Sequence, residues 1–252
     1  MTGLEQADHG GIAVGPRRRV LLVSFAPDDE AVADAMTALA AHLETAALAS
    51  GLRDHTIAAF HATGGYRPDP SRPQRFVPAA AGVQLDYEPG TEQEVIALVR
   101  GIEVPAAAGD VAVSAGRVVT CLEPAPGAYL LLLGAQRKPG MTPEEFGRYW
   151  SQTHAPHAVG DLRAAPVPIG YELFLVDHDL SAQMATGRCL ASRVDGWMHM
   201  TTLGPSDLAG VIRDPAHSAW VLQDEVNFVD FAAPLVGQQM HLLSSDSHPT
   251  TK

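Results

Sequence analysis

The sequence predicts an α+β fold in which two tandem ferredoxin-like βαββαβ units form one barrel within a single chain. The strand and helix pattern of residues 19–121 returns in the same order over residues 129–243. A short linker, 123–127, keeps the two halves together. The run Tyr129–Leu133 is apolar without alternation, which indicates a strand covered on both faces, so we expect a second sheet to face it across a lumen.

The first half shows four strand patterns and two helix patterns. Apolar residues recur at helical spacing over residues 28–50, which predicts the first helix. The second helix, 91–102, begins at Thr91, a capping residue with Glu94 three positions later. The predicted strands are residues 19–25, 55–61, 83–88 and 111–121.

The second half repeats this order. Thr142-Pro143, followed by acidic residues, is a helix start that predicts a helix from Thr142 to about His154. Ala155 precedes a proline, which disfavours the α region, so the helix is expected to end near His154 and a new turn to begin at His157. Further helical stretches are expected within residues 206–230. The predicted strands are residues 129–136, 170–176, 195–201 and 237–243.

The predicted domains follow from these patterns. Residues 17–123 form the first unit and 127–243 the second, with loose polar ends at 1–16 and 244–252. Two connections, 62–80 and 178–193, are longer than is usual between such elements. Each fits either a lid over a site or a mobile insertion.

Composition narrows the classes of function. The chain has 252 residues, is 46% hydrophobic and has a net charge of −12, so a nucleic-acid or anionic-membrane surface is not expected. The run Arg17–Arg19 leads into only a short apolar stretch, so neither an export signal nor a membrane span is expected. Two cysteines without metal-ligand spacing indicate a reduced, cytoplasmic chain.

The helix that begins at Thr142 places a histidine on its apolar side. His154 then either bonds a backbone carbonyl at the helix end or serves as a catalytic base. A metal pair of His154 and His157 is disfavoured, because Pro156 breaks the helical register between them and no acidic or cysteine ligand is spaced nearby. The residues that share this face are Phe146, Tyr149, Trp150, Thr153 and His154.

One stretch of the second half carries a recognisable motif: Arg137-Lys-Pro-Gly-Met-Thr-Pro-Glu-Glu-Phe146, followed by Tyr149-Trp150 and His154-Ala155-Pro156. This motif resembles the EthD-like family of the dimeric α+β barrel superfamily. Asp195-Gly196 and residues 224–230 fit the same family, so the resemblance spans about 127–243. The first half carries no such signature. Members usually form the barrel from two chains.

The resemblance implies acid/base chemistry without a cofactor on a small, largely apolar molecule. The family includes polyketide cyclases, anthrone dehydratases, muconolactone isomerases and a protein required for ether degradation. Its histidine at the end of the first helix corresponds to His154, whereas the resemblance implies no role for His157. An alignment of Asp28 with Thr142 places Ala40 at the position of His154, so one site per chain is expected, unless a shift of two residues brings His42 to that position.

Further candidates come from the strands. Strand parity places either Tyr171 or Glu172 in the lumen and sets His199 beside Trp197. For these strand residues, contact with water at a strand end is the open alternative to catalysis. The catalytic candidates are His154, His199, Glu172 and Tyr171. The substrate-binding candidates are Tyr149, Trp150, His157, Trp197, Phe174 and Tyr66.

These observations predict a cofactor-independent lyase or dehydratase, cyclase or isomerase that uses histidine as the acid/base on a small apolar, aromatic or polyketide-like metabolite. No metal and no cofactor are expected, and dimerisation through outer surfaces stays open. Two alternatives are a haem-binding barrel, since relatives elsewhere in the superfamily bind haem through a histidine, and a non-catalytic ligand-binding accessory protein of a monooxygenase or degradation system.

Overall fold

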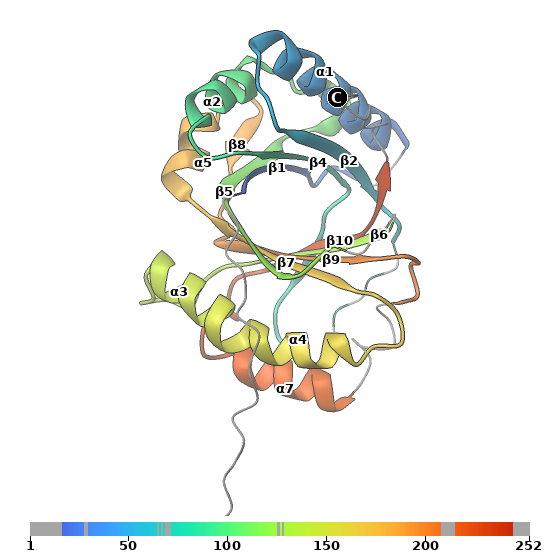
Figure 1. Ribbon diagram of the computed structural model, residues 1–252, viewed down its shortest axis with the longest axis vertical. Helices are drawn as coiled ribbons and strands as arrows, with labels where there is room; N and C mark the ends of the chain where they lie inside the picture. The colour runs from blue at the N-terminus through green and yellow to red at the C-terminus, as the bar shows by residue number, and fades with distance from the viewer. Residues whose placement is uncertain are drawn as a thin grey trace, which may run out of the picture.

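The computed structural model describes residues 17–27, 30–64, 66, 68, 72–124, 127, 129–207 and 215–243, with no side chains described at 215–218. Its centre is a closed barrel of eight strands, each antiparallel to both neighbours (Figure 1). The single-chain α+β barrel is thus confirmed. Around the barrel the strands are β1 (Arg18–Ser24), β4 (Ala81–Tyr87), β2 (Thr56–Ala62), β10 (Leu235–Leu243), β6 (Tyr129–Ala135), β9 (Gly196–Thr202), β7 (Gly170–Val176) and β5 (Val111–Leu122).

Two long strands join the halves. The order is β5-β1-β4-β2 in the first half and β10-β6-β9-β7 in the second, so each half has its last strand at one edge. Strand β5 pairs with β1 through residues 111–117 and with β7 through residues 116–122. Strand β10 pairs with β6 and, near its end, with β2. Each seam between the halves is therefore bridged by main-chain hydrogen bonds along one strand.

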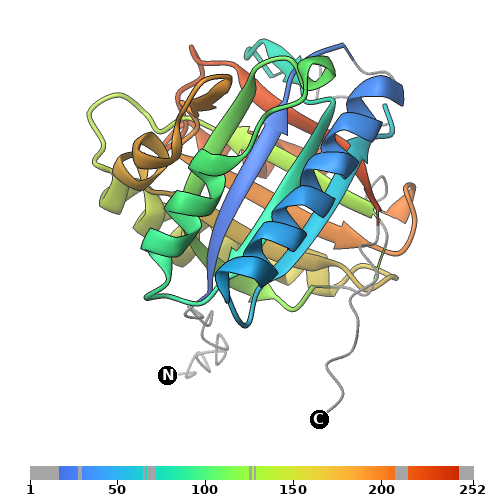
Figure 2. The same cartoon turned by 90° about the horizontal axis from the view of Figure 1, so that it is seen from above.

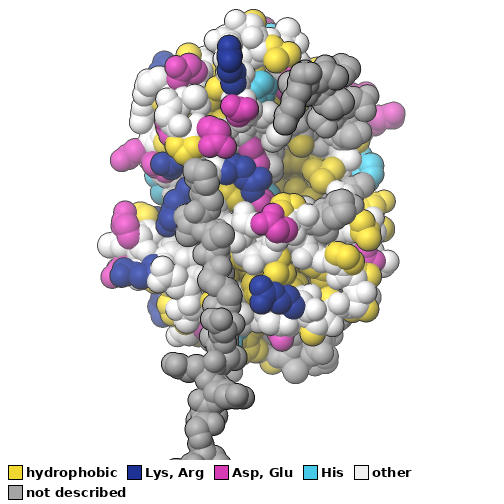
Figure 3. All heavy atoms as spheres, in the orientation of Figure 1, with side chains coloured by type: hydrophobic (Ala, Val, Ile, Leu, Met, Phe, Trp, Pro, Cys, Tyr) yellow, Lys and Arg dark blue, Asp and Glu magenta, His cyan; other side chains and the backbone are white. Residues whose placement is uncertain are grey.

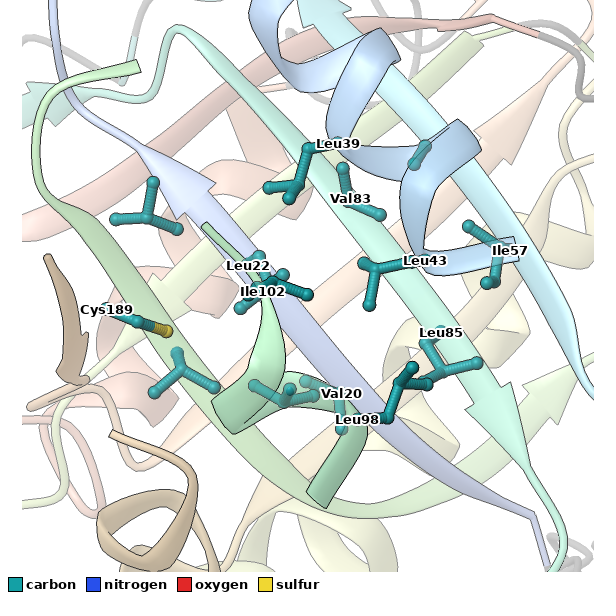
Figure 4. Close-up of a cluster of buried hydrophobic side chains, with 14 of the residues drawn as sticks. Val20, Leu22, Leu39, Leu43, Ile57, Val83, Leu85, Leu98, Ile102 and Cys189 are labelled. Atoms are coloured by element: carbon teal, nitrogen blue, oxygen red, sulfur yellow. The ribbon is translucent and has the colours of Figure 1, made fainter. Parts of the chain in front are cut away.

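Helices cover the outer face of the first half. α1 (Glu30–Ser50) and α2 (Glu92–Gly101) lie along its strands, with the short helix η1 (Ala106–Ala108) beside them (Figures 1 and 2). Leu39 and Leu43 of α1 pack against Val83 and Leu85 of β4 in the core between helices and sheet (Figure 4). The spacing of four between these leucines places them on one helix face, as the sequence pattern predicted.

A second helix layer covers the opposite side of the barrel. It contains α3 (Pro143–Tyr149), the π-helical turn η2 (Trp150–His154), α4 (Ala155–Arg163) and α7 (Pro215–Glu225) (Figure 1). Helix α7 lies on the outer side of α4 in this view. The layer encloses a core of its own between the helices and the second sheet.

The predicted helix end near His154 is wrong, because the helix continues. Ala155 has helical angles (φ −59°, ψ −38°), and its N–H bonds the carbonyl of Trp150, five residues back. Pro156 lacks an N–H and its ring would crowd the preceding turn of a regular α-helix. A π turn adds one residue at that point and so accommodates the proline. It also shifts the register, so Thr153, predicted on the buried face, is exposed.

The segment 178–193 is neither a lid nor a loose insertion, so that prediction is also wrong. It forms α5 (His178–Met184) and β8 (Cys189–Ala191), which pairs with β5. The Asp177 side chain caps α5 by accepting from the Leu180 N–H. Leu180 and Met184 are buried in the first core, which anchors the segment.

Of the segment 62–80, the structure describes β3 (Phe76–Pro78), which pairs in parallel with β10. Residues 65, 67 and 69–71 lie outside the described part of the chain, so the lid prediction for this loop stays a prediction. The predicted arm 1–16 and tail 244–252 also lie outside it. Within the described ranges, no helix combines the length and apolar character needed to cross a membrane.

The lumen is a third core, built by both halves. β1 contributes Leu21 and Val23, and β2 contributes Phe60. From the second half come Phe174 and Trp197, among others, and all of these side chains are buried. Figure 3, in the orientation of Figure 1, shows a hollow between the halves with hydrophobic side chains inside it. Neither half can bury its lumen face alone.

We expect residues 124–252, expressed alone, to be insoluble or to pair with a second copy. This fragment lacks β5 and β2, so it exposes its lumen residues and leaves β7 and β10 each without one neighbour. Size-exclusion chromatography with light scattering, beside the full chain, measures the outcome. A stable, folded monomer of this fragment would show that the shared lumen is not required.

Candidate functional site

The predicted site residues fall into two groups on opposite faces of the second sheet. Of the two residues that strand parity left open, Glu172 faces the lumen and Tyr171 faces the helices. The lumen group is Glu172, Phe174, Trp197 and His199. The helix-side group is Tyr149, Trp150, His154, Tyr171 and, at its margins, Tyr66 and His157.

The start of α3 is fixed by its cap. Thr142 accepts from the N–H of Glu145, and the Glu145 carboxylate accepts from the N–H of Thr142. This capping box and Pro143 set the helix register, which buries Phe146 and Trp150 against the sheet. The register predicted from sequence is therefore correct up to the π turn, and it brings His154 to the buried side.

Gly196 allows the aromatic rings of α3 and η2 to lie directly on β9. A Cβ at this position would lie 2.6 Å from Cζ3 of Trp150 and 3.1 Å from Cε1 of Phe146. The glycine of the Asp195-Gly196 pair is thus explained by close packing of these rings against the backbone.

His154 is held by a carboxylate from α7. Its Nδ1 lies 2.7 Å from Oδ2 of Asp224, and Tyr149 donates its hydroxyl to the other oxygen, Oδ1, at 2.8 Å. Burial and then the bond to Asp224 raise the pKa of Tyr149, which keeps this donor protonated. Because a carboxylate can only accept, Nδ1 carries a proton, and a neutral His154 has its lone pair on Nε2.

Aromatic rings surround this histidine. The Trp220 ring stacks on the imidazole with centroids 5.2 Å apart, and Phe228 lies at 5.1 Å. His157 is exposed and its ring lies 5.2 Å from that of Trp220. His154 itself is only 6% exposed. The imidazole thus sits among aromatic rings, is largely shielded from water, and has Asp224 as a charged partner.

Tyr171 is a core residue of the same layer. Its ring is 1% exposed. Burial raises the pKa of Tyr171 well above its ordinary value. A phenol in this state stays protonated. Tyr66 packs at the edge of this core.

On the lumen side, Arg19 organises a buried ionic network. Its Nε and Nη2 donate to Asp86 at 2.6 and 2.9 Å, and Nη2 also donates to Glu172 at 2.9 Å. Its Nη1 lies 2.9 Å from Nδ1 of His199. Arg17, nearer the rim, forms ion pairs with Glu172 and Asp86. Two cations meet two carboxylates, so the network is neutral when His199 is neutral.

His199 is neutral for a geometric reason. A guanidinium can only donate, so Nδ1 of His199 accepts from Arg19 and the ring proton lies on Nε2. Burial, followed by the charges of Arg19 and Arg17, lowers the pKa of His199 well below its ordinary value. Nε2 is buried and has no hydrogen-bond partner among the described residues. His199 and Glu172 thus serve the network, and Glu172 accepts hydrogen bonds on both oxygens.

Four important residues were missed as site residues from the sequence: Arg19, Asp86, Asp224 and Trp220. Arg19 was visible as part of a basic run, but its alternation with Leu21 and Val23 is the signal that places it in the lumen. Asp224 belongs to the segment that fits the family signature. Its distance from His154 in sequence gives no indication that the two side chains meet.

Haem does not fit the residues at His154. A porphyrin needs a broad apolar slot beside the ligating nitrogen, whereas His154 is buried and packed against Trp220 and Phe228. Two cavities of about 490 Å³ lie in the described part of the chain, and His154 lines neither. Among the described residues, no three or more histidine, cysteine, aspartate or glutamate side chains are grouped to hold a metal ion.

Comparison with known proteins agrees with the sequence signature. The family model for the EthD domain matches residues 138–232, so the C-terminal half contains an EthD-like domain, as the motifs predicted. This range includes His154, Asp195 and Asp224. No curated protein matches the chain.

The solved structures to which the chain is similar are distant from it in sequence. A mutant chlorite dismutase from Candidatus Nitrospira defluvii superposes with a TM-score of 0.50 at 8% identity, covering 92% of each chain. Chlorite dismutase from the same organism in complex with imidazole gives a TM-score of 0.45 at 12% identity, covering 89% of this chain and 91% of that one. The first likeness supports the barrel fold and says nothing about the reaction.

Gly196→Ala should destabilise the protein by about 1–3 kcal/mol, because its Cβ would collide with Trp150. Urea denaturation measures the change in the free energy of unfolding. Gly160→Ala in α4 is the matched control, since a Cβ there meets nothing within 4 Å, and it should be neutral or stabilising. Equal stability of the two variants would contradict the packing role of Gly196.

His199 should make the folded state sensitive to acid. The unfolded chain binds a proton at this residue below its ordinary pKa of 6.5, while the folded chain does not. The free energy of unfolding therefore falls as pH drops from about 7 to 5, by up to roughly 1.4 kcal/mol per unit. His199→Gln keeps an acceptor for Arg19 and cannot titrate, so its denaturation curves should show a shallower pH slope. Parallel slopes would refute a neutral His199.

Proposed function

We propose that the protein is an enzyme that moves protons on a small, largely apolar molecule, with His154 as the general base. The observation that carries this proposal is the bond of 2.7 Å between Nδ1 of His154 and Asp224. It orients the ring and leaves the basic lone pair on Nε2. The reaction class is a lyase or dehydratase, cyclase or isomerase that needs no cofactor. The shared strand order of the two halves supports treating them as tandem ferredoxin-like units.

In the proposed step, Nε2 takes a proton from an acidic carbon of the substrate. The C–H electron pair stays on the substrate as an enolate or comparable carbanion, and the ring becomes an imidazolium that can return the proton elsewhere on the molecule. Asp224 stabilises that imidazolium because its negative charge lies against Nδ1. Tyr149 holds the other carboxylate oxygen, so Asp224 cannot rotate away from the ring without breaking a second bond.

The surroundings suit a substrate with an aromatic or other apolar body. Trp220 and Phe228 offer ring faces next to the imidazole, and Trp150 adds a third aromatic ring beside Phe228. Exclusion of water strengthens the pairing of the imidazolium with Asp224. Since His154 is 6% exposed, the proposal requires α7 to move outward for a substrate to reach Nε2. Helix α7 carries Asp224 and Trp220, so its return would restore both the bond from Asp224 to His154 and the ring that stacks on the imidazole.

The test uses two probes of the substrate classes implied by the family, anthrone and muconolactone, in D₂O. We expect the protein to speed uptake of deuterium at the acidic carbon, measured by mass spectrometry. His154→Gln should lower the rate roughly 10²- to 10⁴-fold, because glutamine can bond Asp224 but cannot shuttle a proton. Asp224→Asn should also lower it. His42→Gln on exposed α1 is the control and should keep the wild-type rate.

Two results would contradict the proposal. Equal rates in wild type and His154→Gln, together with a stability loss, would make His154 a hydrogen-bonding residue of the helix layer. Saturable binding of a probe, seen as quenching of tryptophan fluorescence, with no deuterium uptake above buffer would favour the non-catalytic binding protein instead.

A further inference from the structure

A basic cavity lies at one end of the second sheet, away from His154. Its volume is about 490 Å³. It is bounded by the loop between β6 and α3 and by the start of α5. The lining residues are Gln136, Arg137, Lys138, Pro139, Gly140, Met141, His178, Ser192, Arg193 and Asp195. The proposed proton transfer does not use this cavity.

The charge of the lining is unlike that of the rest of the chain. The protein has a net charge of −12, yet the cavity collects three permanent cations, Arg137, Lys138 and Arg193, together with His178. Asp195 is the one carboxylate in the lining. Three cations against one anion leave a surplus of two positive charges, or three when His178 is protonated. Clefts lined by one sign of charge concentrate ions of the opposite sign.

The single carboxylate is already occupied. Asp195 accepts from the main-chain N–H of Arg137 at 2.9 Å, from the Arg137 guanidinium, and from Nε2 of His178 at 2.7 Å. The hydrogen bond to Asp195 raises the pKa of His178, against the effect of burial, so the ring is cationic over a wider pH range. Asp177 also acts on this ring, but its side chain caps α5.

Arg193 and Lys138 remain available to a ligand. Both side chains are exposed, and Arg193 forms no ion pair with a described residue. Lys138 donates to the carbonyl of Val226, which does not neutralise its charge. Asp195 fixes the position of Arg137 and His178, so two of the four cationic groups are held in place before any ligand arrives. Pro139 and Met141 add apolar wall.

We propose that this cavity binds a small organic anion, in which a carboxylate or phosphate group meets Arg193 and its neighbours and a compact apolar body lies against Pro139 and Met141. Arginine suits this recognition because its planar fork matches the geometry of both oxyanions. This anion site is separate from the proposed base, so the proposal does not depend on the proton-transfer reaction.

The experiment titrates the full chain with benzoate, phenyl phosphate and neutral benzamide at fixed ionic strength, followed by amide NMR shifts. Benzoate and phenyl phosphate separate the two anion types, while benzamide keeps the ring and removes the charge. We expect saturable shifts at Lys138, Gly140 and Arg193 with at least one of the anions and none with benzamide. Arg193→Gln should weaken binding roughly two- to fivefold, and Lys138→Gln should add to the loss.

Arg163→Gln is the matched control, because Arg163 is exposed at the end of α4 and does not line the cavity. It should bind the anion as tightly as wild type. Equal shifts with benzamide, equal affinity of Arg193→Gln and wild type, or no saturable shift up to ~10 mM of either anion would each overturn the proposal. The readout is binding, so failure of the proton-transfer assay has no bearing on it.

Discussion

The arrangement of both sheets depends on one buried guanidinium. Arg19 is 1% exposed and bonds Asp86 from its own half and Glu172 and His199 from the other. Burying a charge is unfavourable unless every partner is in place. The two halves must therefore meet in the one register that brings all of these groups to the same level of the lumen. Loss of Arg19 would leave the two buried carboxylates, Asp86 and Glu172, with Arg17 as the one cation paired with them among the described residues.

This requirement also fixes which side of each strand faces inward. A slip of one residue in β7 would replace Glu172 by Tyr171 in the lumen and place an acidic group among the apolar residues of the helix layer. Hydrophobic burial alone would not determine which side of β7 faces the lumen, since Leu173 and Phe174 could each be buried on either face. The network and the bridging strands β5 and β10 thus act together: main-chain bonds close the barrel, and the ionic cluster selects the register.

The fold was predictable because its signals are local. Strand alternation, the Thr142 cap and apolar helix spacing each concern neighbouring residues, and they gave the element order and the barrel. The prediction failed where two local rules competed. Ala155 before Pro156 should leave the helix, but a π turn accommodates the proline, which no spacing rule anticipates. Likewise, the segment 178–193 was interpreted as a long loop, whereas it contains a helix of seven residues.

The site was harder to predict because it depends on pairs that are distant in sequence. His154 was placed on the buried side of its helix from spacing alone, yet its partner, Asp224, follows 70 residues later. The same limit applied to His199, whose role depends on Arg19, 180 residues earlier. Parity set His199 on the same strand face as Trp197, and the structure shows that this face lines the lumen. It could not show that an arginine would meet its Nδ1 and so hold the ring neutral.

The two faces of the second sheet therefore have different roles: the lumen face holds the ionic network, and the helix face holds the proposed base. Glu172 and His199 cannot readily serve as acid and base, since the first is bonded on both oxygens and the second carries its proton on a nitrogen buried in the lumen. The helix face has an oriented histidine instead. In the first half, the position aligned with His154 is Ala40, which is buried against its own sheet. That half supplies Arg19 and closes the barrel, so the His154–Asp224 pair has no counterpart at the aligned position of the first half. The lumen network that stabilises the fold lies outside the proposed reaction.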